Sequence, residues 1–223
     1  MSAGSALVAA ALMASAADWV AVGREAKRAE YLLKPLALAL LVAGAVAFRG
    51  SASNGRWAWT VAALLLSLAG DVFLMLPRDL FVAGLASFLL AHAAYVVAFN
   101  QAAPPPGRTV VAAVGVLGVG ASLYVPIRRG AAAKGHPELA VPLAVYLLAI
   151  GAMVVSAIGT AGRPDWTGGA SALAVAGAGL FFVSDALIGW TRFVGDVHGS
   201  RVIIIVTYHV AQAMLTLALV SGV

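Results

Sequence analysis

The sequence predicts an all-helical membrane protein, because its composition and the lengths of its apolar runs fit a lipid bilayer. Of the 223 residues, 62% are hydrophobic and only 10% are charged, and the mean hydropathy is +0.98. A helix needs about 20 mostly apolar residues to cross the hydrocarbon core. We therefore expect a polytopic bundle of about eight transmembrane helices, which forms a single domain over residues 1–223.

Polar and turn-forming residues divide the chain into these spans. The first apolar run ends in Ala14-Ser15-Ala16, which resembles a signal-peptidase site, but no Lys or Arg precedes it, so we expect a retained helix. Later breaks fall at the glycines of 50–55, at Pro77, at the prolines of 104–107, in the loop 126–137 and at Pro164. The predicted spans, in order, are 5–23, 31–48, 57–76, 80–100, 108–125, 138–160, 168–190 and 201–222.

The distribution of basic residues predicts the topology. The odd-numbered loops carry ten Lys and Arg residues, and the even-numbered loops carry four. By the positive-inside rule the odd loops face the cytoplasm and both termini lie outside. We expect the protein in the inner membrane of a bacterium.

Composition also argues against several classes of function. The chain has no cysteine, so it has neither disulfides nor thiolate metal sites. The net charge of +5 is spread over short loops rather than over one face, which does not favour nucleic-acid binding. Metal and nucleotide motifs are absent from the sequence. We therefore expect no cofactor and no metal, with water as the only co-substrate; the sequence does not indicate an oligomeric state.

Two acidic residues stand out because they lie inside predicted spans. Asp71 and Asp185 each lie about five residues from the end of a span, or roughly 8 Å along a helix. Acids at this depth usually face a polar cavity, pair with a partner or mark a pathway. The simpler alternative is a hydrogen bond between helices. Because both spans run in the same direction, the two acids are predicted at the same depth, near the cytoplasmic face, where they can meet.

Other polar residues converge on this half of the bundle. Lys34 opens the second span from the same side, and Tyr208 lies about two turns into the eighth. His92 and Gln212 are predicted nearer the midplane. Alone, His92 or Tyr95 is more typical of a satisfied core residue than of a catalyst. His209 points about 100° away from its neighbour Tyr208, so we choose Tyr208 for the cavity.

A weak similarity between the two halves of the sequence indicates two parallel four-helix repeats. Gly70-Asp71 is followed by Phe81 and a helix bearing His92, while Ser184-Asp185 is followed by Phe193 and a helix bearing Tyr208. A shift of four spans preserves orientation, so a site would lie between the halves.

These residues and their spacing resemble the YhhN family of membrane proteins, whose characterised members are lysoplasmalogenases. The resemblance spans nearly the whole chain, although the first span and the loop 126–137 match poorly, and His209 stands where an apolar or aromatic residue is expected. The matching pieces are Leu33-Lys34-Pro35-Leu36, 67–76, 81–92, Tyr95, 142–146, Ser184-Asp185, Phe193, Thr207-Tyr208 and Ala211-Gln212.

The resemblance implies hydrolysis of the vinyl ether bond of a lysoplasmalogen to a fatty aldehyde and glycerophosphoethanolamine or glycerophosphocholine. Asp71 and Asp185 match the family's candidate catalytic aspartates. We predict as substrate-binding or supporting residues Lys34, Ser67, His92, Tyr95, Tyr146, Ser184, Tyr208 and Gln212.

The chemistry of a vinyl ether fits paired carboxylates independently of the resemblance. The bond resists base and opens when an acid protonates its terminal carbon, which gives an oxocarbenium ion. One aspartate would donate the proton while the other, ionised, stabilises the cation, as paired carboxylates do in glycosidases; the sequence does not assign which. Lys34 or Arg192 is a candidate for the phosphate, although both also fit interface residues that snorkel to the headgroups.

Two other classes use intramembrane aspartates. A small proton-coupled transporter would use the same acids as a relay and would move its substrate without chemical turnover. An intramembrane aspartyl protease also places two aspartates on different helices, but its Gly-x-Gly-Asp motif is replaced here by Leu68-Ala69-Gly70-Asp71, and a Tyr-Asp partner is missing.

Overall fold

A computed structural model describes residues 2–220 and confirms the predicted all-helical fold. Eight helices are long and apolar enough to cross a membrane, and residues 2–220 contain no strand. The chain is therefore an integral membrane protein. The helices are α1 (Ala3–Gly23), α2 (Lys27–Ala47), α3 (Asn54–Met75), α4 (Phe81–Phe99), α5 (Pro106–Ala133), α6 (Ala140–Ile158), α7 (Gly168–Phe193) and α8 (Ser200–Val220), and a 3-10 turn, η1 (Pro137–Leu139), precedes α6.

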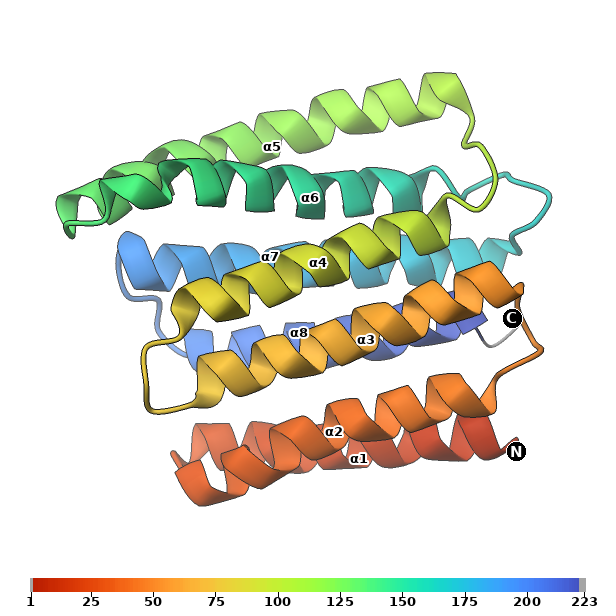
Figure 1. Cartoon of the computed structure of the whole chain (residues 1–223), viewed down its shortest axis with the longest axis horizontal. Helices are drawn as coiled ribbons and strands as arrows, with labels where there is room; N and C mark the ends of the chain where they lie inside the picture. Colours follow the sequence, from red (N-terminus) through yellow and green to blue (C-terminus); the bar gives the residue numbers. More distant parts are fainter. Residues whose placement is uncertain (1, 221–223) are drawn as a thin grey trace.

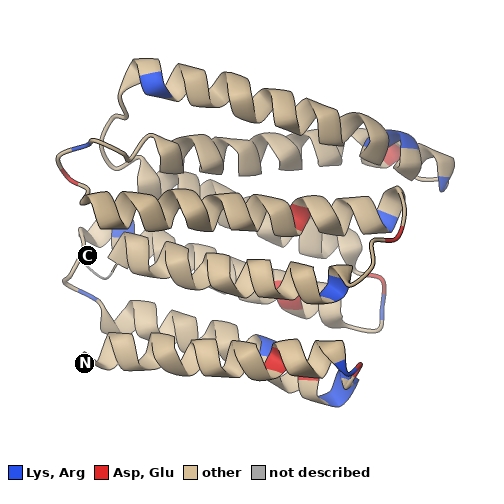
Figure 2. Ribbon diagram, turned by 180° about the vertical axis from the view of Figure 1, so that it is seen from behind, with Lys and Arg blue, Asp and Glu red and all other residues tan. Residues whose placement is uncertain are grey.

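The helices lie side by side along one direction and alternate in sense (Figure 1). In this view α1 and α2 form one side of the bundle, α5 and α6 form the other, and α3, α4, α7 and α8 fill the centre. We call the end that carries the connections 24–26, 76–80, 134–139 and 194–199 the charged end. Most Lys, Arg, Asp and Glu residues gather toward this end (Figure 2).

Short polar residues start three of the helices. The side chains of Ser2, Ser53 and Thr167 accept hydrogen bonds from backbone N–H groups three residues ahead, at 3.1, 3.3 and 3.0 Å. These caps satisfy donors that would otherwise lack partners at the first turn. The chain can therefore leave a helix and begin the next one within a few residues.

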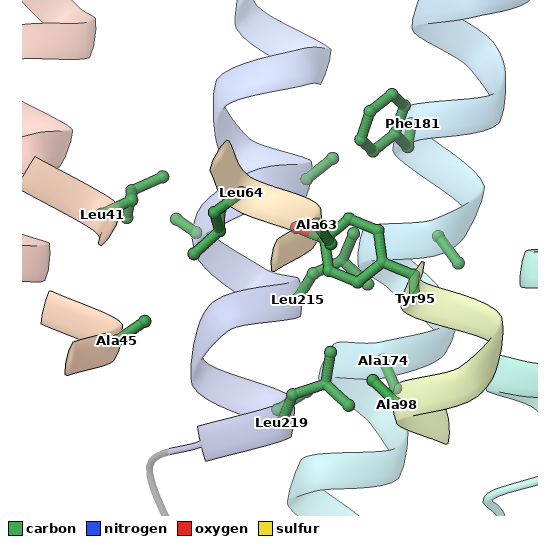
Figure 3. Close-up of a cluster of buried hydrophobic side chains, with 14 of the residues drawn as sticks. Leu41, Ala45, Ala63, Leu64, Tyr95, Ala98, Ala174, Phe181, Leu215 and Leu219 are labelled. Atoms are coloured by element: carbon green, nitrogen blue, oxygen red, sulfur yellow. The ribbon is translucent and has the colours of Figure 1, made fainter. Parts of the chain in front are cut away.

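Small residues allow the central helices to pack closely around a few large ones. Tyr95 of α4, Phe181 of α7 and Leu215 of α8 are fully buried together with Ala63 and Ala98 (Figure 3). In a bilayer, where lipid is as apolar as leucine, van der Waals packing of this kind and polar contacts hold helices together. The central helices are therefore closely packed around the hydroxyl group of Tyr95.

The fifth helix differs from the sequence prediction. It continues to Ala133, past Pro126, whereas we expected a span ending near residue 125 and a loop from 126 to 137. Ile127 and Ala131 are buried on this extension, and Gly130 lies directly against the backbone carbonyl of Phe193. Packing against the end of α7 thus keeps the chain helical beyond a proline, which tertiary contacts can compensate in a membrane bundle.

A second finding concerns a basic residue of a short loop that is buried. Arg163, in the connection between α6 and α7, is only 4% exposed. Its guanidinium donates to the Asp165 carboxylate at 2.7 and 3.0 Å and to the backbone carbonyl of Phe99 at 2.9 Å. Arg56 of α3 also donates to Asp165, at 2.9 Å. These contacts tie α3, α4 and the connection between α6 and α7 together at the end opposite the charged end.

Candidate active site

Asp71 lies on α3 in a closed polar environment. The residue is 1% exposed; Lys34 of α2 donates to Oδ1 at 2.9 Å, and the Tyr208 hydroxyl of α8 donates to Oδ2 at 2.7 Å. Lys34 also lies 5.8 Å from the centre of the Tyr208 ring. The three side chains form a charge-assisted network in which each carboxylate oxygen has its own donor.

Asp185 lies on α7 with a different set of partners. The Tyr146 hydroxyl of α6 donates to its Oδ2 at 2.5 Å, and Nε2 of His92 on α4 lies 3.5 Å from the same oxygen. Among residues 2–220, no Lys or Arg forms an ion pair with this carboxyl group. Asp185 is therefore held by a neutral hydroxyl and an imidazole instead of a fixed positive charge.

The surroundings of the two acids follow one pattern. Each aspartate lies on the third helix of its half of the chain, with one partner from the second helix of the same half and one from the fourth helix of the other half. The Phe181 ring contacts both His92, beside Asp185, and Tyr208, beside Asp71. The two acids therefore belong to one site, although each has its own tyrosine.

Aromatic rings fill the space around this site. The Phe181 ring packs edge-on against His92, Tyr208 and Phe88, with centroids 4.8, 5.4 and 6.1 Å away. Gly70, next to Asp71, makes room for Phe88, whose ring would lie 2.6 Å from an added Cβ. The aromatic cluster thus connects the partners of one acid with those of the other and leaves little space for bulk water.

An apolar pocket opens beside Asp185 but not beside Asp71. It has an empty volume of about 710 Å³, part of it open to the surroundings, and lies between α4, α5, α6 and α7. Asp185 and Tyr146 contribute its acidic and hydroxyl groups next to aliphatic and aromatic side chains. The pocket is lined by Leu74, Phe81, Leu85, Phe88, Leu123, Tyr124, Ile127, Leu143, Tyr146, Leu147, Ile150, Phe182, Asp185, Ala186, Ile188 and Gly189.

The remaining predicted site residues lie away from this pocket. The Tyr95 hydroxyl donates to Gln212 at 2.6 Å, deep in the bundle. Ser184 donates to the Ile204 carbonyl of α8 at 3.1 Å, so it joins two helices. The Ser67 hydroxyl, one turn before Asp71, is buried without a hydrogen-bond partner among residues 2–220. Asp71, Asp185, Lys34, His92, Tyr146 and Tyr208 form the centre, and Tyr95, Gln212, Ser67 and Ser184 surround it.

Sequence reasoning missed a third acid inside the helices. Asp18 of α1 is fully buried, its carboxyl oxygens have no hydrogen-bond partner among residues 2–220, and it interacts electrostatically with Lys34 and Asp71. The signal was available, since Asp18 lies five residues inside the first predicted span, at the same end as the other two acids. The adjacent Trp19 donates to His209 at 3.1 Å, so the histidine faces α1 while Tyr208 faces Asp71.

Within residues 2–220, no group of three or more acidic, histidine or cysteine side chains is arranged to hold a metal ion. The polar centre is made of carboxyl, hydroxyl, imidazole and ammonium groups. These groups can transfer protons and stabilise charge.

Comparison with known proteins places the chain in a family. The model of the YhhN family matches residues 29–219, which include all six residues of the centre but not Asp18. Proteins named lysoplasmalogenase from Mycobacterium bovis and Mycobacterium tuberculosis are each 34% identical over 191 residues, which is 83% of this chain and 68% of each relative. Human lysoplasmalogenase TMEM86B is 30% identical over 168 residues, or 75% of this chain and 66% of the relative. No solved structure matches the chain. The extent of the family match and the identity to these relatives show that the chain belongs to the YhhN family.

Proposed function

We propose that this protein is a membrane hydrolase that cleaves the vinyl ether bond of a lysoplasmalogen, with Asp185 and Asp71 providing acid catalysis. The relatives named lysoplasmalogenase support the reaction. The observation that carries the mechanism is the position of Asp185 and Tyr146 on the wall of an apolar pocket. Such a pocket suits a single hydrocarbon chain, and the carboxyl group is the acid that a bound chain would meet.

The reaction begins with proton transfer to carbon. In its protonated form Asp185 gives its proton to the vinyl carbon farther from the ether oxygen, and the second vinyl carbon becomes an oxocarbenium ion. Water adds to this carbon and loses a proton to the Asp185 carboxylate. The resulting hemiacetal then breaks its bond to the glycerol oxygen, which takes up a proton, and a fatty aldehyde and a glycerophospho-headgroup leave.

Asp71 acts as the ionised member of the pair. Lys34 neutralises it at 2.9 Å and Tyr208 donates to it at 2.7 Å, so its negative charge is stable although it is almost completely buried. Two ionised carboxylates close together in a medium of low dielectric constant repel each other, and one shared proton relieves this repulsion. Asp185 carries that proton, and Asp71 stabilises the cation through its electric field.

Tyr146 and His92 position the acid. The Tyr146 hydroxyl fixes one carboxyl oxygen of Asp185 at 2.5 Å, and the other oxygen is left for the substrate. The His92 ring packs edge-on against Tyr146, with centroids 5.3 Å apart, and thereby limits the rotation of the tyrosine. A carboxyl group held in this way keeps its proton directed at one point in the pocket.

The basic residues at the charged end support an orientation of the whole bundle. More Lys and Arg residues lie at this end than at the opposite end (Figure 2). The site lies nearer to it, since Asp71 and Asp185 are in the C-terminal halves of α3 and α7, which end there. We propose that this end faces the cytoplasm, that both termini lie outside, and that the protein resides in a bacterial inner membrane. The substrate then enters from the cytoplasmic leaflet.

Aldehyde release from a purified lysoplasmalogen tests the proposal. The wild type is compared with Asp71→Asn and Asp185→Asn, and with Asp196→Asn, the same change at an exposed loop acid of the charged end. All four proteins must be folded and monodisperse. We expect turnover by the wild type and by Asp196→Asn, and its loss in the other two. Absence of turnover by folded wild type with ethanolamine and choline headgroups would refute the proposed reaction, and full activity of Asp185→Asn would refute the mechanism.

A further inference from the structure

The mouth of the apolar pocket at the charged end carries an arginine that the catalytic scheme does not use. Arg192 lies near the end of α7, and its guanidinium is 4.1 Å from the centre of the Phe81 ring, which lines the pocket. Its Nη2 donates to Asp79 at 2.7 Å. About a third of the Arg192 side chain and most of that of Asp79 are exposed. The ion pair therefore stands at the border between the apolar pocket and water.

Arg192 is in register with Asp185. The two residues are seven positions apart on α7, which is close to two turns, so they share one face about 10.5 Å apart along the axis. Ile188 and Gly189 lie between them on this face and line the pocket. Side chains on a helix lean toward its N-terminus, so the Arg192 side chain starts out in the direction of Asp185.

This spacing is similar to the distance between the vinyl ether and the phosphate of a lysoplasmalogen. Seven bonds separate the terminal vinyl carbon from the phosphorus. An extended chain gains about 3.6 Å for every three bonds, so the two atoms are about 8 Å apart. A hydrogen bond of about 3 Å at the phosphate closes the remaining distance to the guanidinium. A ligand with its vinyl ether at Asp185 can thus bring its phosphate within reach of Arg192.

We propose that Arg192 exchanges its ion pair with Asp79 for the phosphate of the substrate and thereby sets the vinyl ether against Asp185. This proposal rests on the proposed function, since it takes a single-chain ether phospholipid as the ligand. A guanidinium binds two phosphate oxygens through two parallel N–H groups. Asp79 accepts only one hydrogen bond from Arg192, through one carboxylate oxygen, so a phosphate can form more hydrogen bonds with the guanidinium than Asp79 does.

Neighbouring groups favour an anion at this place. Lys134, at the end of α5, donates to the backbone carbonyl of Arg192 at 2.7 Å and adds a second exposed positive charge. The hydrogen bond from Arg192 holds the pKa of the Asp79 carboxyl below its ordinary value, so Asp79 stays ionised. It keeps its ion pair with Arg192 until an anion that binds the guanidinium more tightly replaces it. Asp79 therefore acts as an internal competitor of the phosphate.

The test measures binding, so that it does not depend on turnover. The ligands are 1-O-alkylglycerophosphocholine and 1-O-alkylglycerol, saturated ethers that differ in the phosphocholine group and lack the vinyl bond. Their dissociation constants are measured in mixed micelles at fixed mole fractions. The variants are Arg192→Gln, Arg192→Lys and Asp79→Asn. Arg201→Gln is the matched control, because Arg201 forms a similar ion pair with Glu30, at 3.0 Å, but unlike Arg192 it does not stack on a ring that lines the pocket.

We expect Arg192→Gln to weaken binding of the phospholipid about tenfold and to leave alkylglycerol binding unchanged. Arg192→Lys should keep part of the affinity, Asp79→Asn should tighten phospholipid binding by about twofold to fivefold, and Arg201→Gln should change neither ligand. Equal weakening of both ligands by Arg192→Gln, or no effect of Arg192→Gln and Asp79→Asn on the phospholipid, would overturn the inference. Phosphate-dependent binding without aldehyde release from the vinyl ether would refute the proposed reaction and leave this inference intact.

Discussion

The buried ion pair between Lys34 and Asp71 allows a quantitative test of how the polar centre is stabilised. The perturbation is a double-mutant cycle of Lys34→Met, Asp71→Asn and the combined variant. Both substitutions keep the approximate shape of the side chain, and the asparagine oxygen can still accept the Tyr208 hydroxyl. The Lys34 side chain is 16% exposed and the Asp71 side chain 2% exposed, so solvent screens the pair little.

The magnitude follows from the geometry. At 2.9 Å and an effective dielectric constant of 20, two unit charges attract by about 6 kcal/mol, most of which offsets the cost of removing them from water. Removal of one partner leaves the other charge buried, which costs about 3 kcal/mol. Each single variant should therefore lose about 3 kcal/mol. The double variant leaves neither charge behind, so it should lose much less than the sum, with a coupling energy of about 3 kcal/mol.

Thermal unfolding in one detergent, followed by tryptophan fluorescence, measures these differences. For a domain of this size 1 kcal/mol shifts the Tm by about 2–4 °C, so each single variant should melt about 6–12 °C below the wild type. Additive losses in the double variant would show that the two charges do not depend on each other. Single variants that melt with the wild type would show that water or Asp18 compensates the remaining charge, and the account of Asp71 as a stably ionised group would be wrong.

Three further predictions concern the remaining parts of the molecule. Tyr146→Phe should lower the rate of aldehyde release about tenfold to a hundredfold at unchanged Tm, because it frees the acid; an unchanged rate would exclude a positioning role. Gly70→Ala should cost about 1–3 kcal/mol, because its Cβ would lie 2.6 Å from the Phe88 ring, whereas Gly115→Ala, with no atom within 4 Å, should be neutral or slightly stabilising in the same melting assay. Hydrogen bonding from Arg163 holds the pKa of Asp165 below its ordinary value, so the ionised Asp165 stabilises the fold above about pH 4 and this stabilisation is lost as the pH falls further. The Tm difference between wild type and Asp165→Asn should therefore shrink below that pH. A difference that grows there would contradict this account.

The sequence was sufficient for the parts of the fold that depend on local composition. Eight apolar runs of bilayer length predict eight helices because a bilayer leaves the backbone few alternatives. The same logic fails where long-range packing decides. Pro126 argues for a helix end, but contacts of Ile127 and Ala131 with neighbouring helices carry α5 on to Ala133.

The sequence predicts which residues belong to the centre better than it predicts which of them contact each other. Asp71 and Asp185 are visible as acids inside apolar runs, but their separate tyrosine partners come from helices far away in the chain. Asp18 has the same local signature, but it lies in the first span, outside the residues that match the family. Ser184 shows the converse, since its place beside an aspartate suggested a site residue, while its hydroxyl contacts the backbone of another helix.

The order of charges along the pocket supports the assignment of substrate and site together. Three acids lie inside the helices in the charged half of the bundle: Asp18 and Asp71 are buried, and Asp185 is half-buried on the pocket wall. Lys34 forms the one ion pair of a Lys or Arg with any of them in residues 2–220. Such a centre favours a positive charge that develops beside it. Arg192 at the mouth favours a negative one. A lysoplasmalogen entering the pocket presents its charges in that order, since its oxocarbenium ion forms inside and its phosphate stays at the surface. A substrate that reacts through an anion would instead need basic groups inside the pocket and an acid at its mouth, which is the opposite of the arrangement of Asp185 and Arg192.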